Sequence, residues 1–179
     1  MNIIIVLPII LLFLVVIYFI VYFFYAIFYF IFPMMTWGAF FARIDDESVD
    51  NIIKLAKVKP GQTAVDLGSG DGKIVIALAK AGAIACGFEI NPFLVYTSRR
   101  KIKKAGFSGK AFIKQANLWK EDLSNFDIIT VFGIKFIMSD LERKLKKEMK
   151  PGSLVVSKYF VFPNWEIFAK QGMVNLYKK

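Results

Sequence analysis

The sequence lacks histidine and has a single cysteine, Cys86, among its 179 residues. Without histidine, the most common general base of active sites is unavailable. One cysteine can form neither an internal disulfide nor an all-cysteine metal cluster, and we expect no metal site. Because Cys86 falls within an expected strand, we interpret it as a small buried apolar side chain rather than a reactive thiol.

Charged side chains are absent from the beginning of the chain, where the first one is Arg43. Residues 3–32 form a continuous apolar run, and about 20 such residues are enough to cross a bilayer once. The run has neither the basic leader and small-residue cleavage site of a signal peptide nor the arginines of a transit peptide. We therefore expect residues 1–35 to be a retained single-pass transmembrane anchor.

The lysines and arginines all follow that run, which predicts that the rest of the chain lies on the cytoplasmic side of the membrane. Residues 36–60 are expected to form a linker and a short amphipathic helix, with Trp37, Phe40 and Phe41 as interfacial anchors or as a flap over the next domain. About a dozen residues separate Pro33 from that helix and can span at most ~40 Å. This limit predicts that the chain acts close to the lipid bilayer, on membrane-associated proteins.

The charge balance is basic, with 24 Lys and Arg against 14 Asp and Glu and a formal net charge of +10. Such an excess can hold a domain against anionic lipid, bind nucleic acid, or simply solvate the surface. The densest cluster, residues 99–104, lies in the last turns of an expected helix, where cations complement the helix dipole. We interpret it as a solvated helix end and do not expect a nucleic-acid partner. The oligomeric state stays open.

Strands and helices alternate through residues 61–179, which we expect to form one domain. The expected strands are 63–67, 83–89, 111–115, 126–132 and 153–159, and segments 165–170 and 173–177 are typical of a hairpin. Helices are expected at 72–80, from Pro92 to about Gly106, and from a capping box at Ser139–Glu142 to about Met149. This alternation predicts a doubly wound α/β fold with a mainly parallel, seven-stranded sheet and a C-terminal hairpin. Ligands then bind at the carboxyl ends of the strands.

The segment VDLGSGDGK at residues 65–73 is an apolar strand that breaks into an acidic, glycine-rich turn. A dinucleotide-binding turn has the spacing G-x-G-x-x-G, whereas this turn has G-x-G-x-G and Lys73 stands where the third glycine would be. Asp66 and Asp71 flank the turn and would repel a pyrophosphate. They would attract the sulfonium and ammonium groups of S-adenosyl-L-methionine, which we predict as the cofactor. A dehydrogenase is the distant alternative.

Further polar residues follow the next strands in the order that a methyl-donor site requires. Glu89 ends the second strand, where a carboxylate can accept both ribose hydroxyls, and Asn117 follows the third, where its amide could pair with the adenine edge. Phe132 and Gly133 end the fourth strand, beside the expected place of methyl transfer. The predicted cofactor-binding residues are Asp66, which would receive the ammonium group, Gly68, Ser69, Gly70, Asp71, Gly72, Glu89, Asn117, Phe132 and Gly133.

Several motifs carry a resemblance to a known family. They are LAKVKPG at 55–61, DLGSGDG at 66–72, GFEINP at 87–92, NLWK at 117–120, VFG at 131–133 and FVFPNW at 160–165. The chain resembles the Rossmann-like (class I) S-adenosylmethionine-dependent methyltransferases. It is most similar to the protein-lysine N-methyltransferases of the adenine nucleotide translocase and the ATP synthase c subunit, with their prokaryotic relatives. The resemblance implies lysine as the methyl acceptor. Asn117 departs from it, since the mitochondrial members have Asp at that position.

No individual catalytic residue is predicted, because positioning supplies most of the acceleration in an in-line methyl transfer. An acceptor lysine, with a pKa of about 10.4, must first lose its proton, and an apolar channel lowers that pKa. Tyr159, Phe160, Phe162 and Trp165 are candidates for such an acceptor channel, with ordinary core packing as the equal alternative.

Three functions remain after these observations. The first is a membrane-anchored protein-lysine methyltransferase. The second keeps the cofactor but methylates RNA or a small amphipathic molecule, and the third is a non-catalytic membrane adaptor that retains the fold.

Overall fold

The computed structural model describes residues 3–35, 41–133 and 135–179, and it describes side chains at residues 7–28, 41–133 and 135–179. The chain divides into two compact units, Met1–Phe40 and Phe41–Lys179. The predictions for Trp37 and Phe40 lie outside the described residues.

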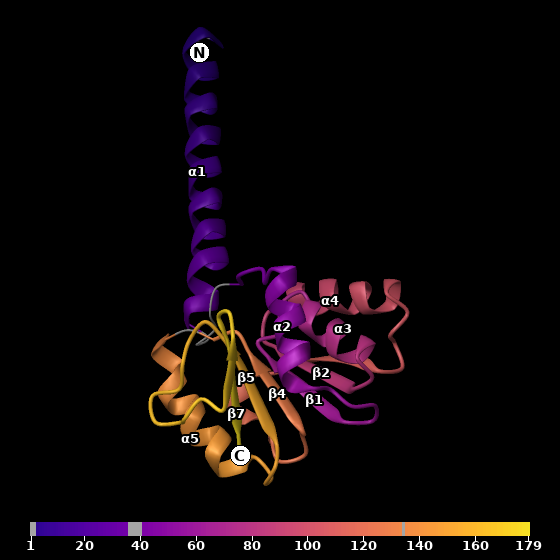
Figure 1. Cartoon of the computed structure of the whole chain (residues 1–179). Coiled ribbons are helices and arrows are strands. Elements are labelled where there is room, and N and C mark those ends of the chain that lie inside the picture. Colours follow the sequence, from indigo (N-terminus) through magenta and orange to yellow (C-terminus); the bar gives the residue numbers. More distant parts are fainter. Residues whose placement is uncertain (1–2, 36–40, 134) are drawn as a thin grey trace. The chain divides into compact units, whose positions relative to one another are not determined.

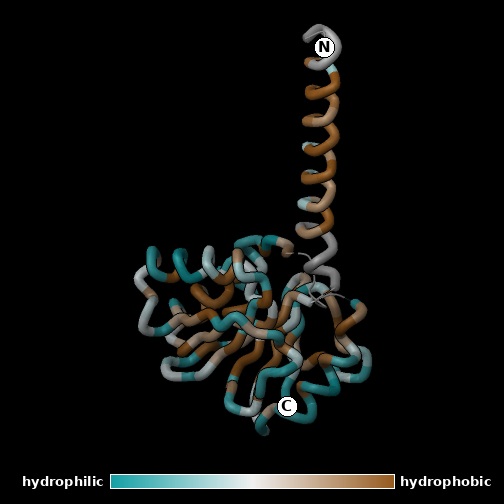
Figure 2. The backbone as a smooth tube through the Cα atoms, turned by 180° about the vertical axis from the view of Figure 1, so that it is seen from behind, coloured by the Kyte–Doolittle hydropathy of each residue, from teal (hydrophilic) through white to brown (hydrophobic). Residues whose placement is uncertain are grey.

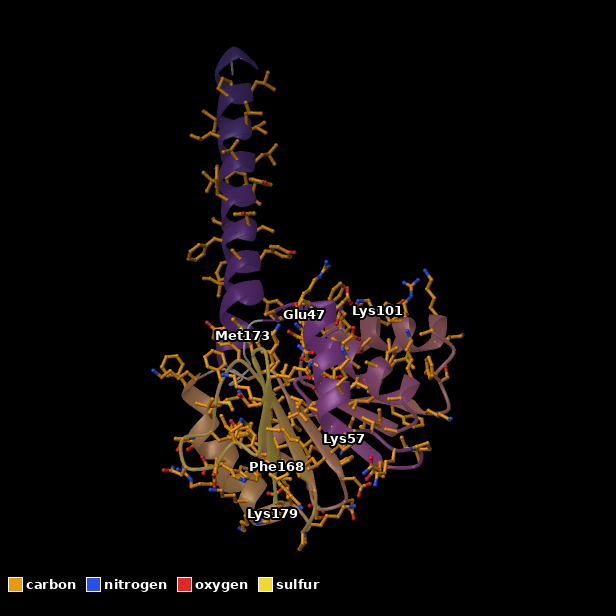
Figure 3. The ribbon with its side chains drawn as sticks, viewed as in Figure 1. Glu47, Lys57, Lys101, Phe168, Met173 and Lys179 are labelled. Carbon is orange, nitrogen blue, oxygen red and sulfur yellow. The ribbon has the colours of Figure 1, made fainter. Side chains whose placement is uncertain are left out.

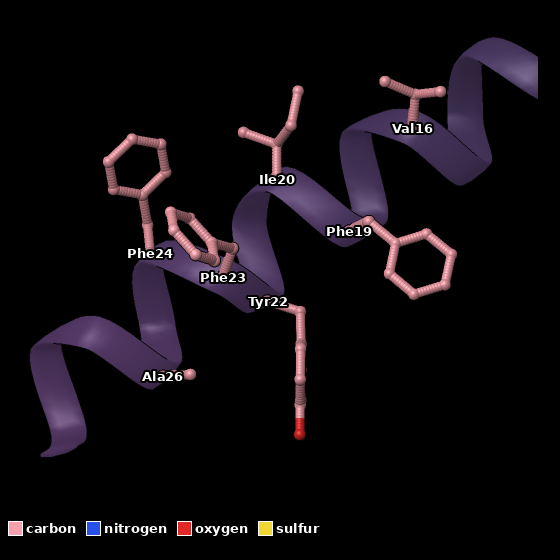
Figure 4. Close-up of a pocket in the computed structure, with 7 residues that line it drawn as sticks. All are labelled: Val16, Phe19, Ile20, Tyr22, Phe23, Phe24 and Ala26. Carbon is pink, nitrogen blue, oxygen red and sulfur yellow. The ribbon is translucent and has the colours of Figure 1, made fainter.

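The first unit contains helix α1 (Ile3–Met35), which continues two residues beyond Pro33. Its segment Leu7–Phe28 has a mean hydropathy of 2.9 and is long and apolar enough to cross a membrane, although a signal sequence would meet the same criteria. Figure 4 shows the side chains from Val16 to Ala26 leaving the helix in several directions, with the hydroxyl of Tyr22 as the polar group among the seven drawn. A helix that is apolar on all sides is suited to lipid or to a protein interior.

The second unit is built on a seven-stranded sheet with the order β3-β2-β1-β4-β5-β7-β6. The strands are β1 (Thr63–Leu67), β2 (Ile84–Glu89), β3 (Ala111–Gln115), β4 (Ile128–Val131), β5 (Leu154–Lys158), β6 (Ala169–Gln171) and β7 (Val174–Lys178). Strands β1 to β5 pair in parallel, while β7 pairs antiparallel with both β5 and β6. The predicted mainly parallel sheet with a C-terminal hairpin is confirmed.

Helices cover both faces of this sheet, as Figure 1 shows. Helices α2 (Asp46–Ala56), α3 (Lys73–Lys80) and α4 (Pro92–Lys104) pack on one face, and α5 (Met138–Glu148) packs on the other. Strands β1 and β4 are buried along nearly their whole length, which explains why their sequences are mostly apolar. Asp66 and Thr130 are the buried polar exceptions. Figure 2 shows the same division, with hydrophobic strands inside and hydrophilic helix surfaces outside.

Most of the expected elements lie within two residues of their observed bounds, but the first hairpin strand, expected at 165–170, is shorter and begins later, as β6 (Ala169–Gln171). The cap of α5 also differs from the expected one. The capping-box prediction at Ser139–Glu142 is wrong: the helix begins at Met138 and its N-cap residue, Ile137, makes no side-chain cap. The 3-10 turn Lys135–Ile137 runs directly into α5, so Ser139 already lies inside the helix. Glu142 instead accepts the backbone N–H of Asn164 and pairs with Lys146.

Candidate functional site

The glycine-rich turn lies at the carboxyl edge of the sheet, between β1 and α3, and its backbone N–H groups point inward. The N–H groups of Gly68 and Ser69 both donate to the carbonyl of Phe88, at 2.9 and 3.0 Å. The N–H of Gly70 donates to Oε2 of Glu89 at 2.8 Å. Phosphate-binding loops use such N–H groups for the ligand. In this turn the three N–H groups already donate to the Phe88 carbonyl and the Glu89 carboxylate. They are therefore not available to a pyrophosphate, which disfavours such a ligand.

Glu89 is the acid that the turn is built around. It is 7% exposed at the end of β2, and its second oxygen, Oε1, accepts the N–H of Asn91 at 2.8 Å. Asn91 in turn caps α4 with its side chain. One carboxylate therefore joins the glycine turn to the start of α4, and its position is fixed by two backbone donors.

Asp66 lies beside Glu89 as a second buried acid. It is 2% exposed in β1 and accepts a hydrogen bond from the Thr130 hydroxyl at 2.7 Å. The pKa of Asp66 is raised to about 7: burial raises it most, the Thr130 hydrogen bond lowers it, and the nearby charges of Glu89 and Asp71 raise it. Asp66 has no ion-pair partner among the residues that the structure describes, and a bound cation would favour its ionised form.

Asp71, the other acid of the turn, has a different environment. Its carboxylate pairs with Lys101 of α4 at 2.6 Å. Its charge is therefore compensated within the protein, and the attraction for a cation comes mainly from Glu89 and Asp66. The assignment of Asp71 to the cofactor stays a prediction.

The three glycines of the turn have three different surroundings. A Cβ on Gly68 would meet no atom within 4 Å, and its φ of +76° lies in the region that side chains disfavour. A Cβ on Gly72 would lie 2.9 Å from Cβ of Ser98, so Gly72 allows α4 to approach α3 closely. Gly70 lies under the ring of Phe41. Gly68 therefore leaves open space at the site, while the other two permit internal contacts.

Ser69 supplies a further sign of a ligand site. Its side chain is buried, and its Oγ has no hydrogen-bond partner among the described residues. A Cβ on Gly87 of β2 would lie 2.5 Å from this Oγ, so the absence of a side chain there makes room for the hydroxyl. An unpartnered buried hydroxyl next to two acids and open space fits a polar, cationic cofactor.

Residues 41–46, here called the N-terminal strap, cross the same edge of the sheet. The Phe41 ring lies against Gly70, so that a Cβ there would be 2.5 Å from Cε2 of the ring. Lys73 donates to the carbonyl of Ile44 at 2.7 Å and pairs with Asp46 at 2.8 Å. The lysine that replaces the third dinucleotide glycine thus fastens the strap over the turn.

Lys158 fastens the strap from the other side. It is 8% exposed at the end of β5, pairs with Asp45, and lies over the Phe132 ring at 5.0 Å. Asp45 also caps α2 by accepting the N–H of Ser48, and the Lys158 and Ser48 contacts lower the pKa of Asp45 far below its usual range. The ends of β4 and β5 and the start of α2 therefore meet at one cluster.

The other predicted cofactor residues lie along the carboxyl edge. Phe132 and Gly133 follow β4, and Gly133 is packed against Met138, whose Sδ would be 3.0 Å from a Cβ. Asn117 follows β3 and its side-chain oxygen accepts the N–H of Trp119 at 3.0 Å. The structure brings these residues to the edge that carries Glu89, and their contacts with a cofactor stay predictions.

The four residues of the predicted acceptor channel are not brought together. Tyr159 and Phe160 follow β5 at the carboxyl edge, with ring centroids 4.9 Å apart. Phe162 is 3% exposed and packs on Tyr177 in the core. Trp165 donates from Nε1 to the carbonyl of Lys178, which pairs with the first residue of β5, so it lies at the opposite edge of the sheet.

Figure 3 shows these two edges, with Met173 at the upper edge and Phe168 and Lys179 at the lower one. Met173 lies in the β6–β7 turn, and its carbonyl accepts the N–H of Tyr159, which places Tyr159 at the upper edge. Of the four residues, Tyr159 and Phe160 follow β5 at the carboxyl edge, and their part in an acceptor site stays a prediction. Phe162 and Trp165 have the core-packing role that was the alternative for them.

Sequence reasoning missed Thr130, Lys73 and Lys158 as site residues. Thr130 is a fully buried polar residue in an otherwise apolar strand, and that exception is a signal that could have identified it. The partners of the two lysines lie 29 and 113 positions away along the chain, so no local pattern indicates them.

Comparisons with known proteins agree with this geometry. A family model for the ANTKMT methyltransferase domain matches residues 66–169. The chain is 38% identical over 125 residues to the human lysine N-methyltransferase of the ATP synthase c subunit, covering 70% of this chain and 53% of the relative. It is 35% identical over 122 residues to a protein-lysine N-methyltransferase of Saccharolobus islandicus, covering 67% of this chain and 76% of the relative.

A solved structure has the same fold. The chain matches an RNA methyltransferase from Salinibacter ruber in complex with S-adenosyl-L-homocysteine with a TM-score of 0.72 and 30% identity, covering 76% of this chain and 91% of that one. The chain spans about half the length of several of the curated relatives it matches, the human protein among them.

Proposed function

Because the chain belongs to the family of ANTKMT methyltransferase domains, we propose that it is an S-adenosylmethionine-dependent protein-lysine N-methyltransferase. The observation that carries the proposal is the Glu89 carboxylate, buried at the end of β2 and fixed by the N–H groups of Gly70 and Asn91. Together with Asp66 it makes the glycine turn a site for a cation. The names of the human and Saccharolobus relatives supply lysine as the acceptor class.

The residues present fit this cofactor. Glu89 would bind the ribose hydroxyls, Asp66 would receive the ammonium group, and the hydroxyl of Ser69 would gain the partner it lacks. When bound, S-adenosylmethionine supplies a methyl group that is already activated by the positive charge on sulfur. The protein then needs to position the acceptor nitrogen and keep it unprotonated, because only the neutral amine has a free electron pair.

Exposed aromatic side chains near the site suit the second task. Tyr159 is 58% exposed and Phe136 is 90% exposed, and both follow strands that end at the carboxyl edge. When the ammonium group of an acceptor lysine moves from water to a place between such rings, it loses hydration. This loss lowers its pKa and favours release of the proton. We propose that Tyr159 and Phe160 border the entry path of the acceptor lysine.

Membrane anchorage is part of the proposal. The segment Leu7–Phe28 could cross a bilayer once, and the cations that follow it favour a cytoplasmic position for the second unit. The substrates would then be membrane-associated proteins. This agrees with the ATP synthase component named for several relatives and with the adenine nucleotide translocase named for a mouse relative, which is 38% identical over 125 residues.

RNA is a second candidate substrate, because the Salinibacter ruber neighbour is described as an RNA methyltransferase and covers most of its own length. A small amphipathic acceptor and a non-catalytic adaptor are the remaining alternatives. All of them are separated by one labelling experiment.

The full chain in detergent or nanodiscs is incubated with radiolabelled S-adenosylmethionine and a membrane fraction from cells that lack it. We expect label that protease removes and nuclease does not, and mass spectrometry should place methyl groups on lysine. Label sensitive to nuclease or extracted by organic solvent would show a different acceptor. The Glu89→Gln variant is the negative control and should give no label. Glu166→Gln makes the same chemical change at an exposed acid outside the site, and it is the matched control that should keep the label. Absence of both labelling and cofactor binding in the unaltered chain would indicate an adaptor.

A further inference from the structure

One segment of the second unit is rich in cations and free of acids. Residues 90–120 contain eight Lys and Arg and no Asp or Glu. This segment forms α4 and β3, and β3 is the outermost strand at its end of the sheet. The excess positive charge of the chain is therefore concentrated on one part of the domain rather than spread evenly.

Six of the eight cations of this segment fall into two groups of three. Arg99 donates to the carbonyl of Ile113, Lys101 pairs with Asp71, and Lys114 pairs with Glu121. These three fasten α4 and β3 to the fold.

Three other cations follow one another on the outward face of α4: Arg100, Lys103 and Lys104. All three are exposed, and none has an ion-pair partner among the described residues. With Tyr96 they line a shallow surface hollow. Figure 3 shows nitrogen-tipped side chains projecting from α4 into solvent. Cations close together without an acid nearby repel one another, and an anionic partner would relieve that repulsion.

Aromatic side chains lie on the same face of α4, one and two turns before the cations. Tyr96 is 60% exposed and Phe93 is 66% exposed, and the Arg100 guanidinium lies over the Tyr96 ring at 5.7 Å. Exposed aromatic rings next to unpaired cations are typical of surfaces that bind at the headgroup level of a bilayer. We call this set, Phe93, Tyr96, Arg100, Lys103 and Lys104, the α4 basic face.

We propose that the α4 basic face docks on the surface of an anionic lipid bilayer. The proposal rests on the proposed membrane anchorage, since a chain with a segment that spans a bilayer keeps its other unit at a high local concentration of lipid headgroups. Lipid is favoured over RNA for this reason, although both carry phosphates.

Docking through this face would also select the acceptor. Helix α4 begins directly after Glu89 and Asn91, so Phe93 lies at the edge of the sheet that carries the cofactor turn, whereas Lys103 and Lys104, at the end of α4, lie toward the opposite edge, where β3 begins. With α4 lying along the headgroups, the cofactor edge is kept within reach of the membrane surface, and acceptor lysines close to that surface are reached in preference to lysines of distant soluble domains. Lysines of soluble peptides remain substrates, because the site itself is unchanged.

The test uses the full chain with Cys86→Ser and Ser108→Cys, which places a donor fluorophore in the exposed loop after α4. The chain is reconstituted in nanodiscs that carry an acceptor fluorophore on the lipid headgroups. We expect more energy transfer with phosphatidylglycerol present than with phosphatidylcholine alone, and loss of the difference in high salt.

The triple variant Arg100→Gln, Lys103→Gln, Lys104→Gln should weaken docking on the order of 100-fold. The matched control is Lys54→Gln, Lys80→Gln, Lys147→Gln, three exposed lysines on other helices.

Equal energy transfer in both lipids, or equal loss in the control variant, would overturn the proposal. If phosphatidylglycerol has no effect and an RNA oligonucleotide binds through the same three residues, the partner of the α4 basic face is RNA and the lipid proposal is wrong. Methylation of a soluble lysine peptide is measured in the same samples. If it persists while docking is absent, the docking proposal alone has failed; if it is absent throughout, the proposed activity has failed.

Discussion

The ring of Phe41 lies directly on Gly70, at a distance that leaves no room for a Cβ on the glycine. Phe41 is the first residue of the second unit, and Gly70 donates its N–H to Glu89. The start of the domain is thus in contact with the turn on which the proposed cofactor site depends. The flap interpretation of this segment is supported for Phe41, whose ring nevertheless remains 43% exposed.

Replacing Phe41 by alanine should weaken cofactor binding about fivefold, because an aromatic wall of the turn is lost. The ring is only half-buried, so Tm without cofactor should change little. Calorimetry with S-adenosylhomocysteine and thermal unfolding measure the two effects. The cofactor affinity of Phe41→Leu, which keeps an apolar side chain, should lie between those of Phe41→Ala and the unaltered chain. A large fall in Tm with unchanged affinity would make Phe41 a packing residue only.

Cofactor affinity should rise with pH through neutrality. Asp66 has a pKa raised to about 7, so it is mostly protonated at pH 6 and mostly ionised at pH 8, and only the ionised form attracts the ammonium group. The affinity should therefore increase about tenfold between these values. In Asp66→Asn this dependence should disappear. The folded state keeps this proton up to about pH 7, whereas the unfolded state releases it near pH 4, so the free energy of unfolding should fall as pH rises from about 4 to 7. A pH-independent affinity in the unaltered protein would contradict this assignment.

Glu89→Gln should reduce cofactor affinity about 10- to 100-fold, the range expected when charge-assisted hydrogen bonds are lost. An amide has one accepting oxygen, so either Gly70 or Asn91 also loses its partner and Tm should fall. Glu89→Asp keeps the charge but shortens the reach, and should retain more affinity than Gln. Equal affinities of the Gln variant and the unaltered chain would remove Glu89 from the site.

The N-terminal strap should open when the two lysines that hold it, Lys73 and Lys158, are replaced. Arg43 is exposed within it and provides a trypsin cleavage site between the contacts made by Phe41 and those made by Ile44, Asp45 and Asp46. Lys73→Met and Lys158→Met should each accelerate cleavage after Arg43 severalfold, because local opening governs proteolysis of a folded chain. Lys80→Met, an exposed lysine of α3, is the control. Added S-adenosylhomocysteine should slow cleavage in the unaltered chain if the strap covers the cofactor.

The sequence predicted the order of the elements and the place of the cofactor turn, because both depend on local patterns. The mostly apolar segments at 63–67 and 126–132 contain the buried strands β1 and β4, and the G-x-G-x-G spacing lies in one turn. Family membership then confirmed the resemblance seen in motifs such as DLGSGDG.

Long-range contacts could not be predicted in the same way. The sequence gives no sign that Asp71 has a partner, but Lys101, 30 positions later, pairs with it and compensates its charge. Trp165 follows Tyr159 by six positions, but the chain runs back across the sheet between them, so the two lie at opposite edges. The capping box of α5 failed because a 3-10 turn precedes it, which no side-chain pattern announces.

Tyr159 has a backbone φ of +72°, a conformation that costs a residue with a side chain about 1 kcal/mol relative to glycine. Such strain beside a site is retained when the side chain has a use there. We therefore expect Tyr159→Gly to raise the free energy of unfolding by up to about 1 kcal/mol and to raise KM for a lysine peptide. Cofactor affinity should stay the same, since the glycine turn is unchanged. Denaturant unfolding and steady-state kinetics measure both. Phe168→Gly, which removes an exposed aromatic ring at the opposite edge, is the control and should leave KM unaltered. A Tyr159→Gly protein with normal KM would show that the acceptor enters elsewhere along the carboxyl edge.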